Sequence, residues 1–289
     1  MAEVRVVVGV PHNPFHLKLT RAPREEWSDG TRRMVELGGM MASKIEQARP
    51  DAIIVVGNDH FHQFFMDNMP AFLVGKMARF DGIFHNEMRE FDMEPCTIPG
   101  DVELAAELLE GGLSQGVDFS YSDQVRLDHA IVTPLLHLGL RPALDVPIVP
   151  ILTNCVAPPL PPARRFYEVG LAVREVIESM DADKKVAVVA SGNVSLEVGG
   201  PRQFLPEPMD EEFDELVAQH IGDGDAGRLI DLCSFERMTQ AGNVTHAVTN
   251  FVLGMGIAEG FACTYAESMR RPGSSQPFFA WEPTRGTVR

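Results

Sequence analysis

The sequence predicts an α/β fold, in which residues 1–289 form one domain with a central mixed sheet and helices on both faces. Short runs rich in β-branched residues alternate along the chain with longer amphipathic stretches, as strands and helices do in such folds. Several of the strand-like runs end in polar residues. The proline-rich stretches break individual elements without marking a domain boundary.

The elements follow one another in an order that local signals support. A proline after Arg49 ends the first helix, and Asp101 after Pro99-Gly100 is a suitable N-cap for the second. Strands are expected at Arg5–Val10, Ile53–Gly57, Ala71–Val74, Pro147–Leu152 and Val186–Ala190. Helices are expected at Gly30–Ala48, Asp101–Leu109, Ala163–Met180, Asp210–Ile221 and Asn243–Gly256.

The composition excludes several classes of partner. Lys and Arg number 25 against 41 Asp and Glu, a formal net charge of −16. Because a negative field repels phosphate backbones and anionic lipid, we expect no nucleic-acid or membrane partner. The four cysteines form no CxxC pair, which favours reduced thiols in a cytoplasmic protein. The first residues lack a signal-peptide pattern, and no membrane span is expected.

Polar clusters follow three of the predicted strands. His12 and Asn13 come after the first, Asn58-Asp59-His60 after the second, and Ser191-Gly192-Asn193 after a later one. In open α/β sheets, ligands bind beyond the carboxyl ends of the strands. If the first two strands are neighbours, His12 and His60 could share one metal ion, and imidazole suits iron, zinc, copper or nickel.

At this point the residues resemble the class III extradiol ring-cleavage dioxygenases, which include protocatechuate 4,5-dioxygenase β subunits and 2,3-dihydroxyphenylpropionate dioxygenases. The match covers nearly the whole chain and depends on the order and spacing of its motifs. Those motifs are His12, the segment from Asn58-Asp59-His60 to Phe72, Leu127-Asp128-His129 with Thr133-Pro134-Leu135, Val156–Pro161, Ala241–His246 and Pro277–Trp281.

The resemblance implies a nonheme Fe(II) ion held by two histidines and one glutamate. In the family, a catecholic substrate binds the iron through two adjacent oxygens, O2 takes a remaining position, and a further histidine acts as acid and base. His12 and His60 match the two histidine ligands, and His129 matches an active-site histidine that could hydrogen-bond a substrate oxygen. We therefore predict His129 as a catalytic residue.

Two positions depart from the family pattern. Ala247 stands where the glutamate ligand is expected, and Leu196 stands where the acid–base histidine is expected. Alanine cannot bind a metal and leucine cannot transfer a proton, so Fe(II) would be weakly bound or absent. Glu197 is the candidate for a relocated carboxylate, although neighbouring positions point in different directions.

The remaining predictions concern the pocket and its partners. Substrate-binding positions are expected at Asn58, Asp59, His62, Ser195, Leu196 and Ala247. His85, beside Asn86 and Glu87, is expected on a mobile loop. The predicted function is oxidative ring opening of a catechol-, aminophenol- or pyridone-like compound with O2. The alternatives are a catalytically degenerate subunit that pairs with an active paralogue, and a metal-assisted nonoxidative enzyme. The chain would be a homo-oligomer or such a hetero-oligomer.

Overall fold

The computed structural model describes residues 1–139, 146–203, 209–271 and 274–284. Its main feature is one mixed sheet in the strand order β10-β11-β1-β9-β2-β8-β3-β6. The bounds are β1 Glu3–Pro11, β2 Ala52–Asn58, β3 Phe72–Gly75, β6 Ser120–Ser122, β8 Ile148–Thr153, β9 Lys185–Gly192, β10 Phe261–Met269 and β11 Gln276–Pro283.

The centre of the sheet is parallel and its edges are mixed. β1 and β2 each pair in parallel with β9, and β2 also pairs in parallel with β8, whereas β11 runs antiparallel to β1 and β3 antiparallel to β8. The carboxyl ends of β1, β9, β2 and β8 therefore meet at one edge, where the polar clusters were predicted.

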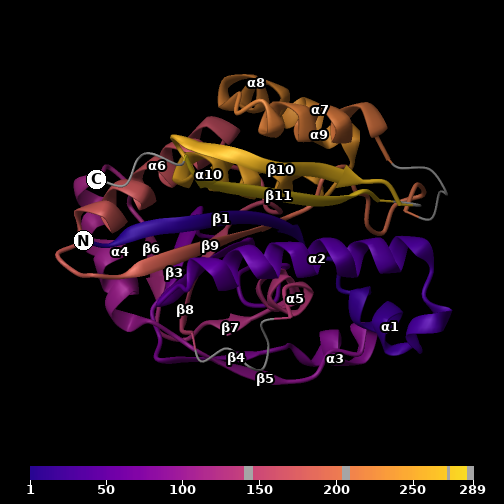
Figure 1. Ribbon diagram of the computed structural model, residues 1–289, viewed down its shortest axis with the longest axis horizontal. Helices are drawn as coiled ribbons and strands as arrows, with labels where there is room; N and C mark the ends of the chain where they lie inside the picture. The colour runs from indigo at the N-terminus through magenta and orange to yellow at the C-terminus, as the bar shows by residue number, and fades with distance from the viewer. Residues whose placement is uncertain (140–145, 204–208, 272–273, 285–289) are drawn as a thin grey trace.

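Helices cover both faces of the sheet, which confirms the predicted fold class. In Figure 1, α7, α8 and α9 lie on one side of β10 and β11, while α2 and α5 lie beyond β1 and β9 on the other side. Alternate strand residues divide between two cores: Ile54 and Val56 pack in one, Ile53 and Val55 in the other. The helices are α1 His16–Arg21, α2 Asp29–Ala48, α3 His85–Phe91, α4 Val102–Ser114, α5 His129–His137, α6 Ala163–Ser179, α7 Glu211–Gly222, α8 Ala226–Leu232, α9 Phe235–Ala241 and α10 Thr249–Ile257.

A second sheet of three short strands positions the start of α5. It consists of β4 Arg79–Gly82, β5 Cys96–Pro99 and β7 Arg126–Leu127, with β4 in the middle. Gly82 pairs with Leu127, so α3, which follows β4, is brought close to α5, which follows β7. This pairing places Glu87 beside His129.

The predicted strands and helices are present, with shifted ends. Helix α4 continues to Ser114, five residues beyond the predicted Leu109, and Asp101 caps it by accepting a hydrogen bond from the Leu104 backbone N–H. The helix predicted from Asn243 starts later. The Asn243 side chain accepts from the Val198 backbone N–H and donates to the Val198 carbonyl oxygen, so it is engaged with another segment. A short 3-10 turn, Thr245–Val248, precedes α10.

Two of the histidines begin helices, and the expectation of a loop at His85 is wrong. His129 is the first residue of α5, because the Asp128 side chain caps that helix by accepting from the Ala130 backbone N–H. His85 begins α3, where the Glu87 side chain accepts from the Phe84 backbone N–H and closes the first turn. In the described residues, no helix is long and apolar enough to cross a bilayer.

Candidate metal centre

His12 and His60 meet at the carboxyl edge of the sheet, although their strands are not neighbours. His12 directly follows β1 and His60 lies two residues beyond β2, and β9 runs between these two strands. Two strand spacings amount to about 10 Å, which two imidazole side chains reaching inward can largely span. Their ring centroids are 5.2 Å apart.

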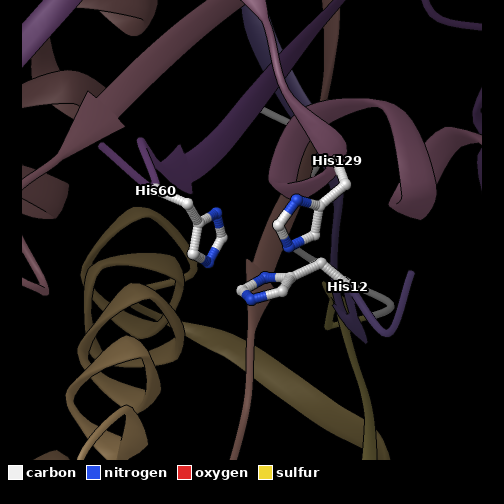
Figure 2. A group of neighbouring side chains, drawn as sticks. All are labelled: His12, His60 and His129. Carbon is white, nitrogen blue, oxygen red and sulfur yellow. The ribbon is translucent and has the colours of Figure 1, made fainter. Parts of the chain in front are cut away.

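His129 joins this pair from α5. Its ring stacks on His60 at a centroid distance of 4.1 Å and an interplanar angle of 20°, and it meets His12 edge to face at 5.7 Å. Figure 2 shows the three rings facing one another across a small space. One ring nitrogen from each histidine lies within 4.8 Å of the other two.

A chain of hydrogen bonds fixes the tautomer of His12. The Ser191 hydroxyl donates to the Ala130 carbonyl oxygen at 2.5 Å, so at 3.0 Å from His12 Nδ1 it acts as an acceptor. The proton of His12 is thereby held on Nδ1, which leaves Nε2 unprotonated. Nε2 accepts from the Asn193 amide nitrogen at 2.7 Å.

Two buried carboxylates fix the other two rings in the same way. Asp128 accepts from the His60 backbone N–H at 3.0 Å and from its Nδ1 at 2.9 Å. Glu87 accepts from the His129 backbone N–H at 2.8 Å and from its Nδ1 at 2.6 Å. Such contacts orient metal-binding imidazoles and increase their basicity. All three rings therefore offer Nε2 lone pairs.

Glu87 is the main residue that the sequence analysis missed. It is completely buried, whereas the local sequence His85-Asn86-Glu87 is that of a polar surface turn. Its role depends on the pairing of β4 with β7, a contact between distant segments that no local pattern reveals. The position of Asp128 as an N-cap just before an apolar helix is a signal that could have been found.

The electrostatics of the cluster favour neutral rings on His12 and His129. Burial, together with the nearby charges of His60 and His129, holds the pKa of His12 well below its usual value. Burial and the charge of His60 also lower the pKa of His129, against the opposing hydrogen bond to Glu87. Burial opposes ionisation of Asp128, but the charge and hydrogen bond of His60 outweigh it and hold the Asp128 pKa well below its usual range. Neutral imidazole is the form that binds metals.

Asn58, Asp59 and His62 lie around the cluster in different roles. The Asn58 amide nitrogen lies 3.1 Å from His60 Nε2, and its buried amide oxygen has no hydrogen-bond partner among the described residues. Asp59 accepts from the backbone N–H groups of His62, Gln63 and Phe64 and so holds the turn after β2. The His62 ring stacks on Phe84, and its Nε2 lies 2.9 Å from the Asn86 amide nitrogen.

Ser195, Leu196 and Ala247 lie where the chain leaves β9 and approaches α10. Ser195 is fully buried, and its hydroxyl accepts from the Asp210 N–H while its own N–H donates to Asp214, so it is engaged in holding the start of α7. The Leu196 backbone N–H donates to the Thr245 hydroxyl. Ala247 packs against the end of β9: a Cβ on Gly192 would lie 2.5 Å from its carbonyl oxygen.

Glu197 is engaged away from the three histidines. Its carboxylate accepts from the Arg202 backbone N–H at 3.1 Å and forms an ion pair with the Arg202 guanidinium at 2.7 Å. In the described part of the chain, the clusters of side chains able to hold a metal ion do not include it. The contacts of Glu197 therefore give no support to the expectation that it is a relocated carboxylate ligand.

The donor set at this edge fits a first-row transition metal. Three imidazole nitrogens suit iron, zinc, copper or nickel, and the neighbouring carboxylates orient two of those rings. Two further clusters overlap this centre, one of Asp59, His62 and Asp128 and the other of Glu87, Asp128 and His129. Only the cluster of His12, His60 and His129 contains both histidines that the sequence predicts as ligands.

Comparison with known proteins finds a family model that matches most of the chain. Residues 8–280 match the family described as the catalytic LigB subunit of aromatic ring-opening dioxygenase. A 2,3-dihydroxyphenylpropionate/2,3-dihydroxicinnamic acid 1,2-dioxygenase of Photorhabdus laumondii is 32% identical over 174 residues, which cover 60% of this chain and 51% of that protein.

Proteins of the same name from other bacteria are similar as well. The one from Mycobacterium sp. strain MCS is 35% identical over 146 residues, or 50% of this chain and 44% of that protein. The one from Cupriavidus necator is 29% identical over 211 residues, which cover 72% of this chain and 61% of that protein. The chain thus spans about half the length of the curated relatives that it matches.

Proposed function

Because the chain belongs to the family of catalytic LigB subunits of aromatic ring-opening dioxygenases, we propose that it opens the ring of a catechol-, aminophenol- or pyridone-like compound with O2. The reaction would use a nonheme Fe(II) ion bound by His12 and His60. Ring opening of this type places both atoms of O2 in the product and breaks one ring carbon–carbon bond, so it consumes no separate reductant.

One observation carries the proposal. His12 and His60 come from strands that are not adjacent, yet each has its Nδ1 proton held by an acceptor, and one nitrogen of each ring lies within 4.8 Å of one nitrogen of the other. Two unprotonated imidazole nitrogens brought this close from separate strands are the donors that a shared metal ion requires. When bound there, Fe(II) would supply the site at which the substrate oxygens and O2 come together.

The surrounding residues are suited to a planar substrate with hydroxyl groups. The Asn58 amide oxygen is buried and unpaired among the described residues, and a substrate hydroxyl could donate to it. The Phe91 ring meets His129 edge to face at 5.4 Å, and Phe84 covers His62. Either of these phenylalanine rings could pack on an aromatic substrate.

A second candidate is a noncatalytic subunit that pairs with an active paralogue. It is favoured by Ala247 and Leu196, which replace the two polar groups that the family uses as the carboxylate ligand and the acid–base residue. Loss of a positioned acid or base typically lowers a rate by about 10²- to 10⁴-fold. Under this reading, the fold and the histidines remain while turnover depends on another chain.

Iron content and oxygen uptake of the purified chain test the two candidates together. We expect about one Fe(II) per chain after anaerobic loading, and O2 consumption with at least one compound from a panel of catechols, aminophenols and hydroxypyridones. The matched control is His12→Ala, which should abolish both. Iron binding without O2 uptake on the whole panel, combined with a co-purifying paralogue that restores turnover, would favour the noncatalytic subunit.

A further inference from the structure

We propose that His129 is the third protein ligand of the metal, so that three neutral imidazoles bind it and its negative charges lie one hydrogen bond away, on Glu87 and Asp128. This inference rests on the proposed function, because it concerns the same Fe(II) site. It differs from the role expected from the sequence, in which His129 transfers a proton to or from the substrate.

The first argument is the position of His129 relative to the other two rings. Nitrogens bound to one ion at about 2.1 Å lie about 3 Å apart. The three ring nitrogens are already within 4.8 Å of one another. Shifts of less than about 2 Å, together with a rotation that turns His129 out of its stack on His60, would bring them onto one ion. In Figure 2, the His129 ring approaches from α5, on a side that neither β1 nor β2 supplies.

The second argument is that Nδ1 of each of the three rings has a hydrogen-bond acceptor. On His12, His60 and His129, Nδ1 lies 3.0 Å or less from an oxygen that accepts its proton. This arrangement leaves Nε2 as the unprotonated nitrogen of each ring, as in metal-bound histidines whose other nitrogen donates to a carboxylate or carbonyl. His129 and His60 each have a buried carboxylate on Nδ1. The Nε2 atoms of His12 and His60 also lie 2.7 Å and 3.1 Å from the amide nitrogens of Asn193 and Asn58, and a bound metal would replace these two contacts.

The third argument concerns charge. With Ala247 in place of a glutamate, the metal lacks a directly bound carboxylate, and a dication in a buried site requires negative charge nearby. Glu87 and Asp128 are both buried and bind two of the three rings. Each can increase the electron density on its imidazole, so the charge of the missing carboxylate is partly replaced through His60 and His129.

Metal binding by the complete, metal-free chain tests the inference. The chain would be titrated with Fe(II) without oxygen, and the Fe(II)–nitric oxide complex examined by pulsed EPR for coupled imidazole nitrogens. Three coupled imidazoles in the wild type support the inference, and two overturn it. This measurement needs no variant, so it remains decisive if a substitution at His129 prevents folding.

Variants provide an independent measurement. His129→Ala should weaken Fe(II) binding as much as His12→Ala does, and by more than the roughly 10- to 100-fold expected for loss of a hydrogen-bonding partner of a ligand. His246→Gln is the matched control, because His246 is a buried histidine outside the cluster, and it should bind Fe(II) as the wild type does. Restored binding in His129→Ala/Ala247→Glu would support a vacated ligand position.

The failures of the two proposals are distinguishable. If His129→Ala binds Fe(II) as tightly as the wild type but has a lower kcat, His129 acts on the substrate, and the ligand assignment is overturned while the proposed function stands. If the wild-type chain binds no Fe(II), both are overturned.

Discussion

One carboxylate oxygen of Glu87 accepts two hydrogen bonds from His129, from the backbone N–H at 2.8 Å and from ring Nδ1 at 2.6 Å. The other oxygen accepts from the Phe84 N–H at 2.9 Å, so this buried carboxylate joins α3 to the first residue of α5. A single side chain therefore fixes both the position and the tautomer of the ring.

Glu87→Gln should keep the fold and weaken metal binding. The glutamine oxygen can still accept from the His129 Nδ1–H, but its NH2 group replaces the oxygen that accepts from the Phe84 N–H, and the negative charge that increases the basicity of the ring is lost. We expect about a 10- to 100-fold loss of Fe(II) affinity, measured by anaerobic titration.

The control for this change is Glu87→Ala. It leaves three N–H donors without their acceptor and should also lower the free energy of unfolding by about 2–4 kcal/mol, measured in urea. Equal Fe(II) affinity in Glu87→Gln and wild type would show that the charge of Glu87 does not reach the metal.

The sequence predicts this site as far as local patterns extend. His12 and His60 are recognisable because each follows an apolar strand, and the sheet then brings both to one edge. By contrast, Glu87 reaches His129 only through the pairing of β4 with β7, which are too short to leave a clear period-two pattern. Likewise, the sequence leaves open whether β1 and β2 adjoin, and the structure places β9, from far along the chain, between them.

Close packing of α2 on α5 should hold His129 in place, and two neighbouring glycines test this. A Cβ on Gly38 would lie 2.4 Å from the carbonyl oxygen of His137, the last residue of α5, whereas a Cβ on Gly39 would meet nothing within 4 Å. We expect Gly38→Ala to lower the free energy of unfolding by about 1–3 kcal/mol, because backbone atoms must move apart.

Gly39→Ala is the matched control one residue further along the same helix. It should raise the free energy of unfolding by up to about 1 kcal/mol through helix propensity alone. Urea unfolding of both variants provides the comparison. A similar effect of the two substitutions would mean that α2 and α5 do not pack as closely as described.

Asp214 should make the stability depend on pH. Burial raises its pKa to about 6, while its Oδ1 accepts from the Ser195 N–H. Because the folded-state pKa is higher than the usual value, the folded chain binds the proton more tightly than the unfolded chain does. This contribution stabilises the fold below the unfolded pKa and is lost as the pH rises through about 6.

Asp214→Asn removes the buried charge and keeps an oxygen for the Ser195 N–H. We expect it to raise the free energy of unfolding at pH 7.5 by up to about 2 kcal/mol, with little effect at pH 4. Urea unfolding of wild type and variant at several pH values measures the difference between them. A difference that stays constant between pH 4 and 7.5 would assign the effect to something other than this carboxyl group.

Ala247→Glu should increase metal retention. Ala247 precedes α10 and lies against Gly192 at the end of β9, one residue before Asn193, whose amide contacts His12. A glutamate there starts from the edge that carries the three histidines and adds an anionic oxygen donor for a dication. We expect roughly tenfold tighter Fe(II) binding, on the scale seen when groups around a metal are changed, measured as resistance to chelators.

The control is Ala241→Glu, at a buried position that ends α9. It adds the same charge at a position that is not next to the three histidines. Unchanged retention in a folded Ala247→Glu protein would mean that the side chain at 247 does not reach the metal.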